Sequence, residues 1–469
     1  MREPLQNEPR AGGQHPLGTA IATGLRTVWH RFRAGLVFLY AEPKLWLLEA
    51  GIAGYLAGMF LFPNIVVHTA WLLFTVAIPI WRWRTSDLNS KAYDDPGFWM
   101  LTGLLAWMLA TSIFVSIPAI DLGDVLTSLV DACGVLSLYA GVSIVVRNRF
   151  QSWRRIIMPF PIAGAIAMLV SVPVFYWLRA DVNTFPSARL RDVLVHIENG
   201  GLHQVVTGLL CGAAAMSAAC LYSNRAHWKK QLLLLSCFTV LTSSLFLTHT
   251  RGAILALLVS FAVYVFTRKD RSWVTPSIIL TIVGLTYAFP SDPKVDDLTS
   301  ISTSPVTHLI ERGDGGRIKL YKHLYSRMDG ATELVLGKGL WANDSATKEE
   351  VGWSVAFHPH SIYMATFYHG GITALMMTVG LLGFGLLRAF AVFRQTGNGT
   401  WLVLFCFGIA GQIVDGSLPF SIMTVPRIEP ILLMFPMIGA SAAWCEYVRD
   451  AVRQPAEANS PAPLENRTS

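Results

Sequence analysis

Charged side chains are scarce in this chain. They make up 14 % of its 469 residues, whereas about 25 % is usual in soluble proteins. The six cysteines form neither a CxxC pair nor a Cys/His spacing, so we predict neither a disulfide framework nor a zinc site. Residues 1–18 contain neither a short apolar segment nor a small-residue cleavage site, so no cleaved signal peptide is expected. These absences argue against a soluble enzyme and against a small secreted protein.

Several catalytic and binding motifs are also absent. The chain contains no GxSxG, HExxH or GxxxxGK[ST] string, which removes the support for serine hydrolases, zinc proteases and P-loop enzymes. Its formal net charge is +7, but the Lys and Arg residues are scattered between apolar blocks and do not alternate with aromatic residues. We therefore predict no nucleic-acid partner.

Apolar residues dominate instead. They make up 53 % of the chain, and they form long blocks with little charge. Each block is long enough to cross the roughly 30 Å of hydrocarbon in a bilayer. The chain is therefore predicted to be an all-α polytopic membrane protein with about 12 transmembrane helices and one large periplasmic loop. The expected spans are residues 44–62, 65–81, 98–118, 124–146, 156–178, 202–222, 231–249, 252–267, 274–290, 361–390, 400–416 and 427–447.

Basic residues indicate how these spans are oriented, because short cytoplasmic loops are enriched in Lys and Arg. The loops after the even-numbered spans are basic, for example RNRFQSWRR after the fourth span and NRAHWKK after the sixth. The segment PAIDLGD after the third span is acidic. Both termini are therefore expected in the cytoplasm.

This topology divides the chain into five parts. They are a cytoplasmic N-terminal tail with an amphipathic helix (1–43), nine spans (44–290), a large periplasmic loop (291–360), three spans (361–447) and a disordered cytoplasmic tail (448–469). We interpret the amphipathic helix as interfacial, with a soluble tail helix as the alternative. In the large loop, apolar residues recur at helical spacing, which predicts a helix over 315–328. A turn at GKGLW follows it.

Arginines on the expected periplasmic side run against the positive-inside pattern and so mark candidate binding sites. They are Arg179, Arg189, Arg191, Arg251, Arg312, Arg317 and Arg427. Arg251 opens the eighth span in THTRGAILALL. A guanidinium there is costly to bury and is expected to face a wet cavity and an anion. The alternative is that it snorkels to lipid phosphates.

Two histidines, His358 and His360, precede the tenth span in HPHSIYMATFYHGG. An imidazole at the outer membrane boundary is able to act as a base near neutral pH, and the alternative is that it anchors the helix among headgroups. Several guanidiniums and an imidazole on one side suit a lipid-linked diphosphate, whose leaving group must be stabilised. The acidic residues of that side show neither a DxD pair nor a metal-ligand spacing near the arginines, so we predict a metal-free site.

Three strings, in this order, resemble the membrane O-antigen ligase and polymerase superfamily. THTRGAILALL resembles the family's Ser-Arg-Gly span start, with Thr250 in place of Ser. GGRIKLYKHLY resembles the Arg-bearing helix of the large outer loop, and LVLGKGLW resembles the Leu-Gly-x-Gly turn that follows it. HSIYMATFYHGGI resembles the His-Asn segment that opens the next span, with Ser361 in place of Asn. Together the strings cover about residues 248–372.

The resemblance implies a GT-C-like glycosyltransferase bundle in the bacterial inner membrane, and the single dominant loop favours the O-antigen ligase branch. Such an enzyme transfers a glycan from undecaprenyl diphosphate to a sugar hydroxyl of the lipid A core at the periplasmic face, among membrane lipids and without a cofactor. The resemblance implies His360 as general base, and Arg191, Arg251 and Arg317 as the residues that bind the diphosphate. Single displacement then predicts inversion at the anomeric carbon. Further candidates are Arg189, His358, Arg312 and Arg427.

Two alternatives to a ligase stay open. One is an O-antigen polymerase of the same superfamily. The other is a transporter that binds a lipid-linked glycan with these arginines and performs no chemistry. The lack of a twofold hydropathy repeat between the two halves of the chain argues against the transporter.

Overall fold

A computed structural model describes most of the bundle. The described residues are 45–62, 65–83, 92–116, 121–148, 152–178, 190, 204–223, 226–268, 317–347, 350, 359–414, 416, 418 and 428–458. The chain divides into two compact units, Met1–Lys44 and Leu45–Ser469, and all described residues belong to the second. The expected N-terminal amphipathic helix and the expected ninth span, 274–290, lie outside the described residues.

The described part is helical, as predicted, and contains no strand. Seven helices are long and apolar enough to cross a membrane, and four shorter apolar helices accompany them. Together they coincide with eleven of the expected spans. The first helices in chain order are α2 (Leu45–Leu61), α3 (Ile65–Leu72), η1 (Leu73–Ala77), α4 (Ile78–Arg82), α6 (Pro96–Ser116), α7 (Leu122–Asn148), α8 (Trp153–Ile157) and α9 (Pro159–Leu178). They continue with α10 (Gln204–Leu221), α11 (Trp228–Leu247), α12 (Arg251–Thr267), α15 (Arg317–Ser326), α16 (Gly330–Leu336), α18 (Ile362–Thr396), α19 (Thr400–Val414) and α20 (Ile428–Ala458).

The second span is not a regular α-helix, which its apolar pattern does not reveal. Leu73–Ala77 forms a π-helical turn between α3 and α4. Pro79 follows near the start of α4. A proline lacks the N–H that closes a helical hydrogen bond, and its ring clashes with the carbonyl four residues back. A widened turn before the proline relieves this conflict while the apolar helix continues.

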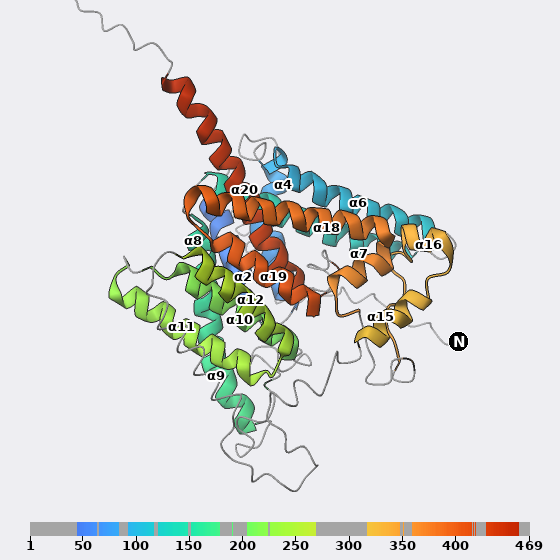
Figure 1. The fold of residues 1–469 in the computed structure, drawn as a ribbon, viewed down its shortest axis with the longest axis horizontal. Helices are drawn as coiled ribbons and strands as arrows, with labels where there is room; N and C mark the ends of the chain where they lie inside the picture. The colour runs from blue at the N-terminus through green and yellow to red at the C-terminus, as the bar shows by residue number, and fades with distance from the viewer. Residues whose placement is uncertain are drawn as a thin grey trace, which may run out of the picture. The chain divides into compact units, whose positions relative to one another are not determined.

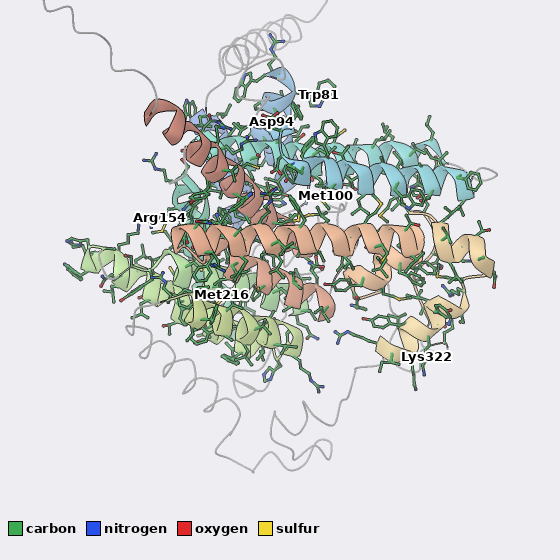
Figure 2. All side chains as sticks on the ribbon, turned by 45° about the horizontal axis from the view of Figure 1, so that its top comes forward. Trp81, Asp94, Met100, Arg154, Met216 and Lys322 are labelled. Atoms are coloured by element: carbon green, nitrogen blue, oxygen red, sulfur yellow. The ribbon has the colours of Figure 1, made fainter. Side chains whose placement is uncertain are left out.

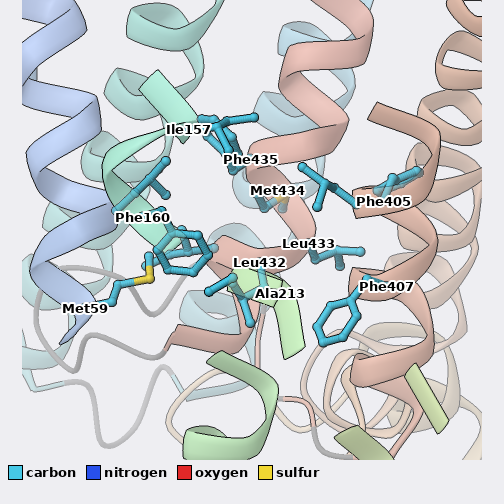
Figure 3. Packing of buried hydrophobic residues seen from close by; sticks show 14 of the residues in the cluster. Met59, Ile157, Phe160, Ala213, Phe405, Phe407, Leu432, Leu433, Met434 and Phe435 are labelled. Carbon is cyan, nitrogen blue, oxygen red and sulfur yellow. The ribbon is translucent and has the colours of Figure 1, made fainter. Parts of the chain in front are cut away.

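The core of the bundle is built around α10. Its sequence QVVTGLLCGAAAMSAACL is rich in Ala, Gly, Ser and Cys, and almost all of its residues are buried. Small side chains let helix backbones approach closely, which is how membrane helices pack. α10 accordingly contacts α9, α11, α12, α19 and α20. Figure 3 shows part of the surrounding core, where Phe407 of α19 lies next to Leu433 of α20.

A buried carboxylate joins three helices of this core. Asp95, directly before α6, is fully buried. It accepts hydrogen bonds from the Tyr139 hydroxyl of α7 at 2.9 Å, the Ser441 hydroxyl of α20 at 2.7 Å and the Gly97 N–H at 3.0 Å. A buried carboxylate is tolerated when it is hydrogen-bonded, so these donors fix the start of α6 against α7 and α20.

The loop before α18 also folds in part. The helix predicted over 315–328 is confirmed as α15, and the turn predicted at GKGLW follows α16. Both α15 and α16 pack on α18, which runs beside α6 and α20 (Figure 1). α18 bends at Gly371, whose φ of 71° is not helical. At the other end of the chain, α20 continues to Ala458, past residue 448 where we expect the tail to begin.

Candidate functional site

The first residues of α12 and α18 lie at the same end of the bundle. α12 and α19 pack together, and Gly399, before the start of α19, lies against Thr267 at the end of α12. The two helices therefore run antiparallel. Gly416, beyond the end of α19, lies against the backbone N of Ile362 at the start of α18. Arg251, which opens α12, and His360, which precedes α18, are thus brought to one end of the bundle, which we call the site end.

His360 has an unusual backbone conformation. Its φ is 54°, in the left-handed region, which costs an L-residue about 1–2 kcal/mol but is less rare for His than for most residues. Ser361 is extended, and its carbonyl accepts the N–H of Ala365 at 2.9 Å to begin the helix. The left-handed residue turns the chain sharply before the helix. As a result, His360 stands half-buried at the helix start, next to the buried Pro359.

Arg251 is preceded by the same sequence of conformations. His249 has a φ of 50°, Thr250 is extended, and Arg251 is the first helical residue of α12. The Thr250 hydroxyl donates to the carbonyl of Gln204 at 3.1 Å, which ties this start to the start of α10. Arg251 is half-buried. Two of the strings that carry the family resemblance therefore form the same local structure, although their sequences differ.

The loop that carries Arg189 and Arg191 reaches the same end of the bundle at one described residue. Leu190 is fully buried, and its N–H donates to the carbonyl of Leu247 at 2.8 Å. Leu247 is the last residue of α11, close in sequence to Arg251. Arg179, Arg189, Arg191, Arg312, Arg427 and His358 themselves lie outside the described residues.

Arg317 opens α15, which packs against the first section of α18. Leu320 and Leu324 of α15 are buried in a small apolar cluster with Tyr368 of α18. Arg317 is half-buried. The helix carrying Arg317 is therefore held beside the section of α18 that begins at Ile362, just after His360. No described distance joins Arg317 directly to Arg251 or His360, so their convergence on one ligand stays a prediction.

The glycine turn after α16 docks onto the bend of α18. The Lys338 N–H donates to the Tyr368 carbonyl at 2.8 Å, and the Gly339 N–H donates to the His369 carbonyl at 2.9 Å. Gly371 has a positive φ, and a Cβ there would lie 2.1 Å from the Val335 carbonyl oxygen. Only glycine fits this position, because it both takes the left-handed conformation and leaves room for the neighbouring backbone.

The same turn is also held by α6 and α7. The Leu340 N–H donates to the Ser112 hydroxyl of α6 at 2.7 Å. The indole N–H of Trp341 donates to the Ser128 hydroxyl of α7 at 3.1 Å. The turn therefore connects three helices at the site end, and the second and third family strings meet there.

His369 fastens this turn. It is 2 % exposed. Its Nδ1 lies 2.7 Å from the Gly339 carbonyl oxygen, and its Nε2 lies 3.1 Å from an oxygen of Asp344. A carbonyl oxygen only accepts hydrogen bonds, so Nδ1 donates to Gly339. Both ring nitrogens therefore have a partner in the segment 339–344. His369 is therefore a positioning residue, and His360 is the better candidate base.

Acidic residues of the folded loop make local ion pairs. Hydrogen bonds from the Thr347 N–H and the Arg327 guanidinium lower the pKa of Glu350. Lys338 pairs with Glu333 at 2.8 Å. These carboxylates stabilise the loop surface. Among the residues that the structure describes, no three His, Cys, Asp or Glu side chains form a metal-binding group, and the metal-free mechanism stays a prediction.

Gln412 is a site-end residue that sequence analysis missed. It lies on α19 and is 2 % exposed. Within the described part of the chain, its Oε1 has no hydrogen-bond partner. Gly416, which lies against Ile362, is also in contact with this oxygen. Buried polar groups usually have a hydrogen-bond partner, so Gln412 is a further candidate for a polar contact near the start of α18. Its sequence context, an amide within an apolar span, carries no motif that would identify it.

Comparison with known proteins identifies a family to which part of the chain is similar. A family model described as O-antigen ligase matches residues 234–379, which confirms the resemblance predicted from the three strings. The match is about a third of the chain. It contains His360, Arg251, Arg317 and the whole turn that His369 fastens. No curated protein matches the chain.

Proposed function

We propose that this chain, whose residues 234–379 match the O-antigen ligase family, transfers a glycan from undecaprenyl diphosphate to a sugar hydroxyl of the lipid A core. The observation that best supports the proposal is the shared geometry of two helix starts. Each start has a left-handed histidine two residues before the helix, and the starts present His360 and Arg251 at the same end of the bundle. Strained backbone of this kind is typical of functional sites.

His360 is the proposed general base. It accepts the proton of the acceptor hydroxyl while that oxygen attacks the anomeric carbon of the donor sugar. The bond between this carbon and the diphosphate oxygen breaks, and undecaprenyl diphosphate leaves from the opposite face, which inverts the anomeric configuration. A positioned base contributes roughly 10²–10⁴-fold to such a reaction.

Arg251 and Arg317 are the proposed diphosphate ligands, together with Arg191. A guanidinium forms two parallel charge-assisted hydrogen bonds with a phosphate. Both Arg251 and Arg317 are half-buried at the starts of their helices. Partial removal from water strengthens their attraction to the charge that develops on the leaving group. Arg189, Arg312, Arg427 and His358 remain secondary candidates.

The glycine turn is proposed to keep these groups in register. It joins α6, α7 and the bend of α18, and His369 holds it from inside. Catalytic groups must be held to within a fraction of an ångström, and side chains locked by packing achieve this. The positive-inside pattern supports a periplasmic location for the site in a bacterial inner membrane.

The direct test is a reconstituted transfer assay. Purified full-length protein is combined with a lipid-linked glycan and lipid A core, with and without EDTA. We expect a covalent glycan–lipid A product in both conditions. Longer lipid-linked glycans in place of that product would show a polymerase. Substrate movement across a vesicle membrane without product would show a transporter. Activity lost in EDTA and restored by magnesium or manganese would contradict the metal-free mechanism.

A further inference from the structure

A cavity of about 530 Å³ lies among five helix ends on the side of the bundle away from the site end. Its walls come from the start of α8, the ends of α10, α12 and α18, and the start of α19. The three helices that end here begin at Gln204, Arg251 and Ile362, so the cavity and the catalytic candidates occupy opposite ends of the same helices. Figure 2 shows Arg154, which lines the cavity, far from Lys322 of α15.

The charged residues of the cavity wall are basic where the structure describes them. Two arginines, Arg154 and Arg268, line it, and no acidic residue among the described ones does. Ser223, Thr396 and Thr400 also line it, and the Thr396 hydroxyl donates to the Val392 carbonyl at 2.7 Å. Guanidinium groups are suited to binding phosphate groups.

Arg268 is held rigidly in the wall. One of its terminal nitrogens donates to the carbonyl of Tyr222 at 2.8 Å and to that of Cys220 at 3.3 Å, both at the end of α10. Its guanidinium also lies over the Tyr264 ring, 5.2 Å from the ring centre. These contacts fix a positive charge at the end of α12. Such preorganisation lowers the entropy that binding an anion would otherwise cost.

Arg154 is the second arginine of the cavity wall. It is exposed, and its guanidinium lies 5.4 Å from the centre of the Trp153 ring. The next residue, Arg155, is also exposed on α8 but does not line the cavity. Arg154 therefore places a positive charge at the cavity, and Arg155 places an equal charge on the same helix outside it.

An apolar surface leads outward from the cavity. Phe393 lines the cavity, and its ring lies 6.5 Å from that of Phe266 and 6.3 Å from that of Phe390. Phe266 is 75 % exposed and Phe390 is 42 % exposed. Exposed apolar side chains on a membrane protein mark a surface that lipid chains can cover. A ligand with a phosphate head and an acyl chain matches both the cavity and this surface.

We propose that the cavity binds the headgroup of an anionic phospholipid, with its acyl chain along Phe266 and Phe390. The positive-inside pattern places this end of the bundle in the cytoplasmic leaflet, where basic pockets between helices bind lipid headgroups. The lipid is a structural ligand that is not consumed. The proposal stands apart from glycan transfer, because its site, its ligand and its measurement are separate from those of the reaction.

The test measures lipid binding directly. Purified full-length protein in detergent is titrated with phosphatidylglycerol or phosphatidylcholine, and native mass spectrometry counts the retained lipid. Arg154→Gln is compared with Arg155→Gln, its matched control on the same helix. We expect wild type and Arg155→Gln to retain phosphatidylglycerol equally, and Arg154→Gln to bind it about tenfold more weakly, the effect of one lost charge-assisted bond. Arg268→Gln loses two carbonyl bonds and stability as well, so Arg154→Gln is the deciding variant.

Three outcomes would overturn the proposal. Equal weakening by Arg154→Gln and Arg155→Gln would show general surface attraction rather than a cavity. Equal retention of phosphatidylglycerol and phosphatidylcholine would remove the preference for an anion. Displacement of the lipid by inorganic phosphate in the same titration would show a site for the free anion. Persistent lipid binding in the presence of phosphate supports the lipid as the ligand.

Discussion

The two ends of the bundle use different kinds of backbone. At the site end, left-handed residues occur at both helix starts, His249 and His360, and in the glycine turn and the bend of α18. At the opposite end, Gly397 is the only described residue with a positive φ, and it is an ordinary glycine cap whose N–H donates to the Phe393 carbonyl. Strained backbone is therefore concentrated at the end of the bundle that carries His360 and Arg251.

The arginines of the two ends differ in the same way. Arg268 is fixed by carbonyls and an aromatic ring at the end of a regular helix. Arg251 is placed by a strained turn and by the bond from Thr250 to α10. The first arrangement suits a ligand that stays bound. The second suits a site in which the direction of a charge matters for each turnover.

The largest effect is expected from the imidazole at the site end. We expect His360→Ala to fold and insert normally but to lose about 10²–10⁴-fold of the transfer rate, because it removes a proton acceptor. His227→Ala, at the exposed start of α11 on the opposite end, is the control and should transfer at the wild-type rate. The reconstituted assay at matched expression measures both. Wild-type turnover by His360→Ala would show that His360 is not the general base.

A smaller loss is expected from the arginines of the site end. Truncating Arg251 or Arg317 to Ala should raise the barrier to transfer by roughly 2–4 kcal/mol, the usual cost of a lost oxyanion donor. Lys at either position should restore activity only in part, because an ammonium loses the two-pronged geometry. Arg155→Ala, at the opposite end, is the control. Full rescue by Lys, or little loss with Ala, would mean that the residue merely snorkels to lipid headgroups.

Substitution of two glycines with positive φ compares the stability of the two ends of the bundle. Gly371 lies at the site end and Gly397 at the opposite end. Gly371→Ala puts a Cβ 2.1 Å from the Val335 carbonyl oxygen, whereas Gly397→Ala has nothing within 4 Å of the new atom. Both lose the glycine-favoured conformation, at about 1 kcal/mol. Overpacking should cost Gly371→Ala a further 1–3 kcal/mol or so. Thermal unfolding and hydrogen exchange of residues 337–344 measure the difference, and equal stability of the two variants would contradict it.

The smallest effect concerns the loop surface. The pKa of Glu350 lies below its ordinary value of 4.5 because Thr347 and Arg327 stabilise its charged form. A lowered folded-state pKa gives stability that is present above 4.5 and is lost as the pH falls below it. We expect hydrogen exchange around Arg327 to speed up slightly in that acid range. Glu350→Gln should abolish the pH dependence of hydrogen exchange around Arg327. If the variant keeps the wild-type pH profile, other groups cause the dependence.

Much of the fold was predictable because its signals are local. A long apolar block specifies a membrane helix without reference to the rest of the chain, and α15 follows from Leu324 and its neighbours at helical spacing. The turn at Gly337 and Gly339 was also predicted. The π-helical turn at Leu73–Ala77 was not, because the apolar pattern is the same for α and π geometry.

The site was predictable in its residue types but not in its contacts. Sequence analysis identified Arg251, Arg317 and His360. An arginine on the expected periplasmic side runs against the positive-inside pattern, and an imidazole at the membrane boundary is able to act as a base. The role of His369 depends on Gly339 and Asp344, which are distant in sequence and come close only when the turn docks. The cavity opposite the site is likewise formed by five separate helix ends, and no single segment indicates it.

The carboxylate of Asp95 has a consequence for how the protein is made. One of its donors, Ser441, belongs to α20 and follows Asp95 by 346 positions. Chains generally fold from the N-terminus as they are synthesised. During synthesis the start of α6 therefore waits for a partner that is made 346 residues later. Until α20 packs, Asp95 lacks the bond from Ser441, so the start of α6 is fixed only after α20 is in place.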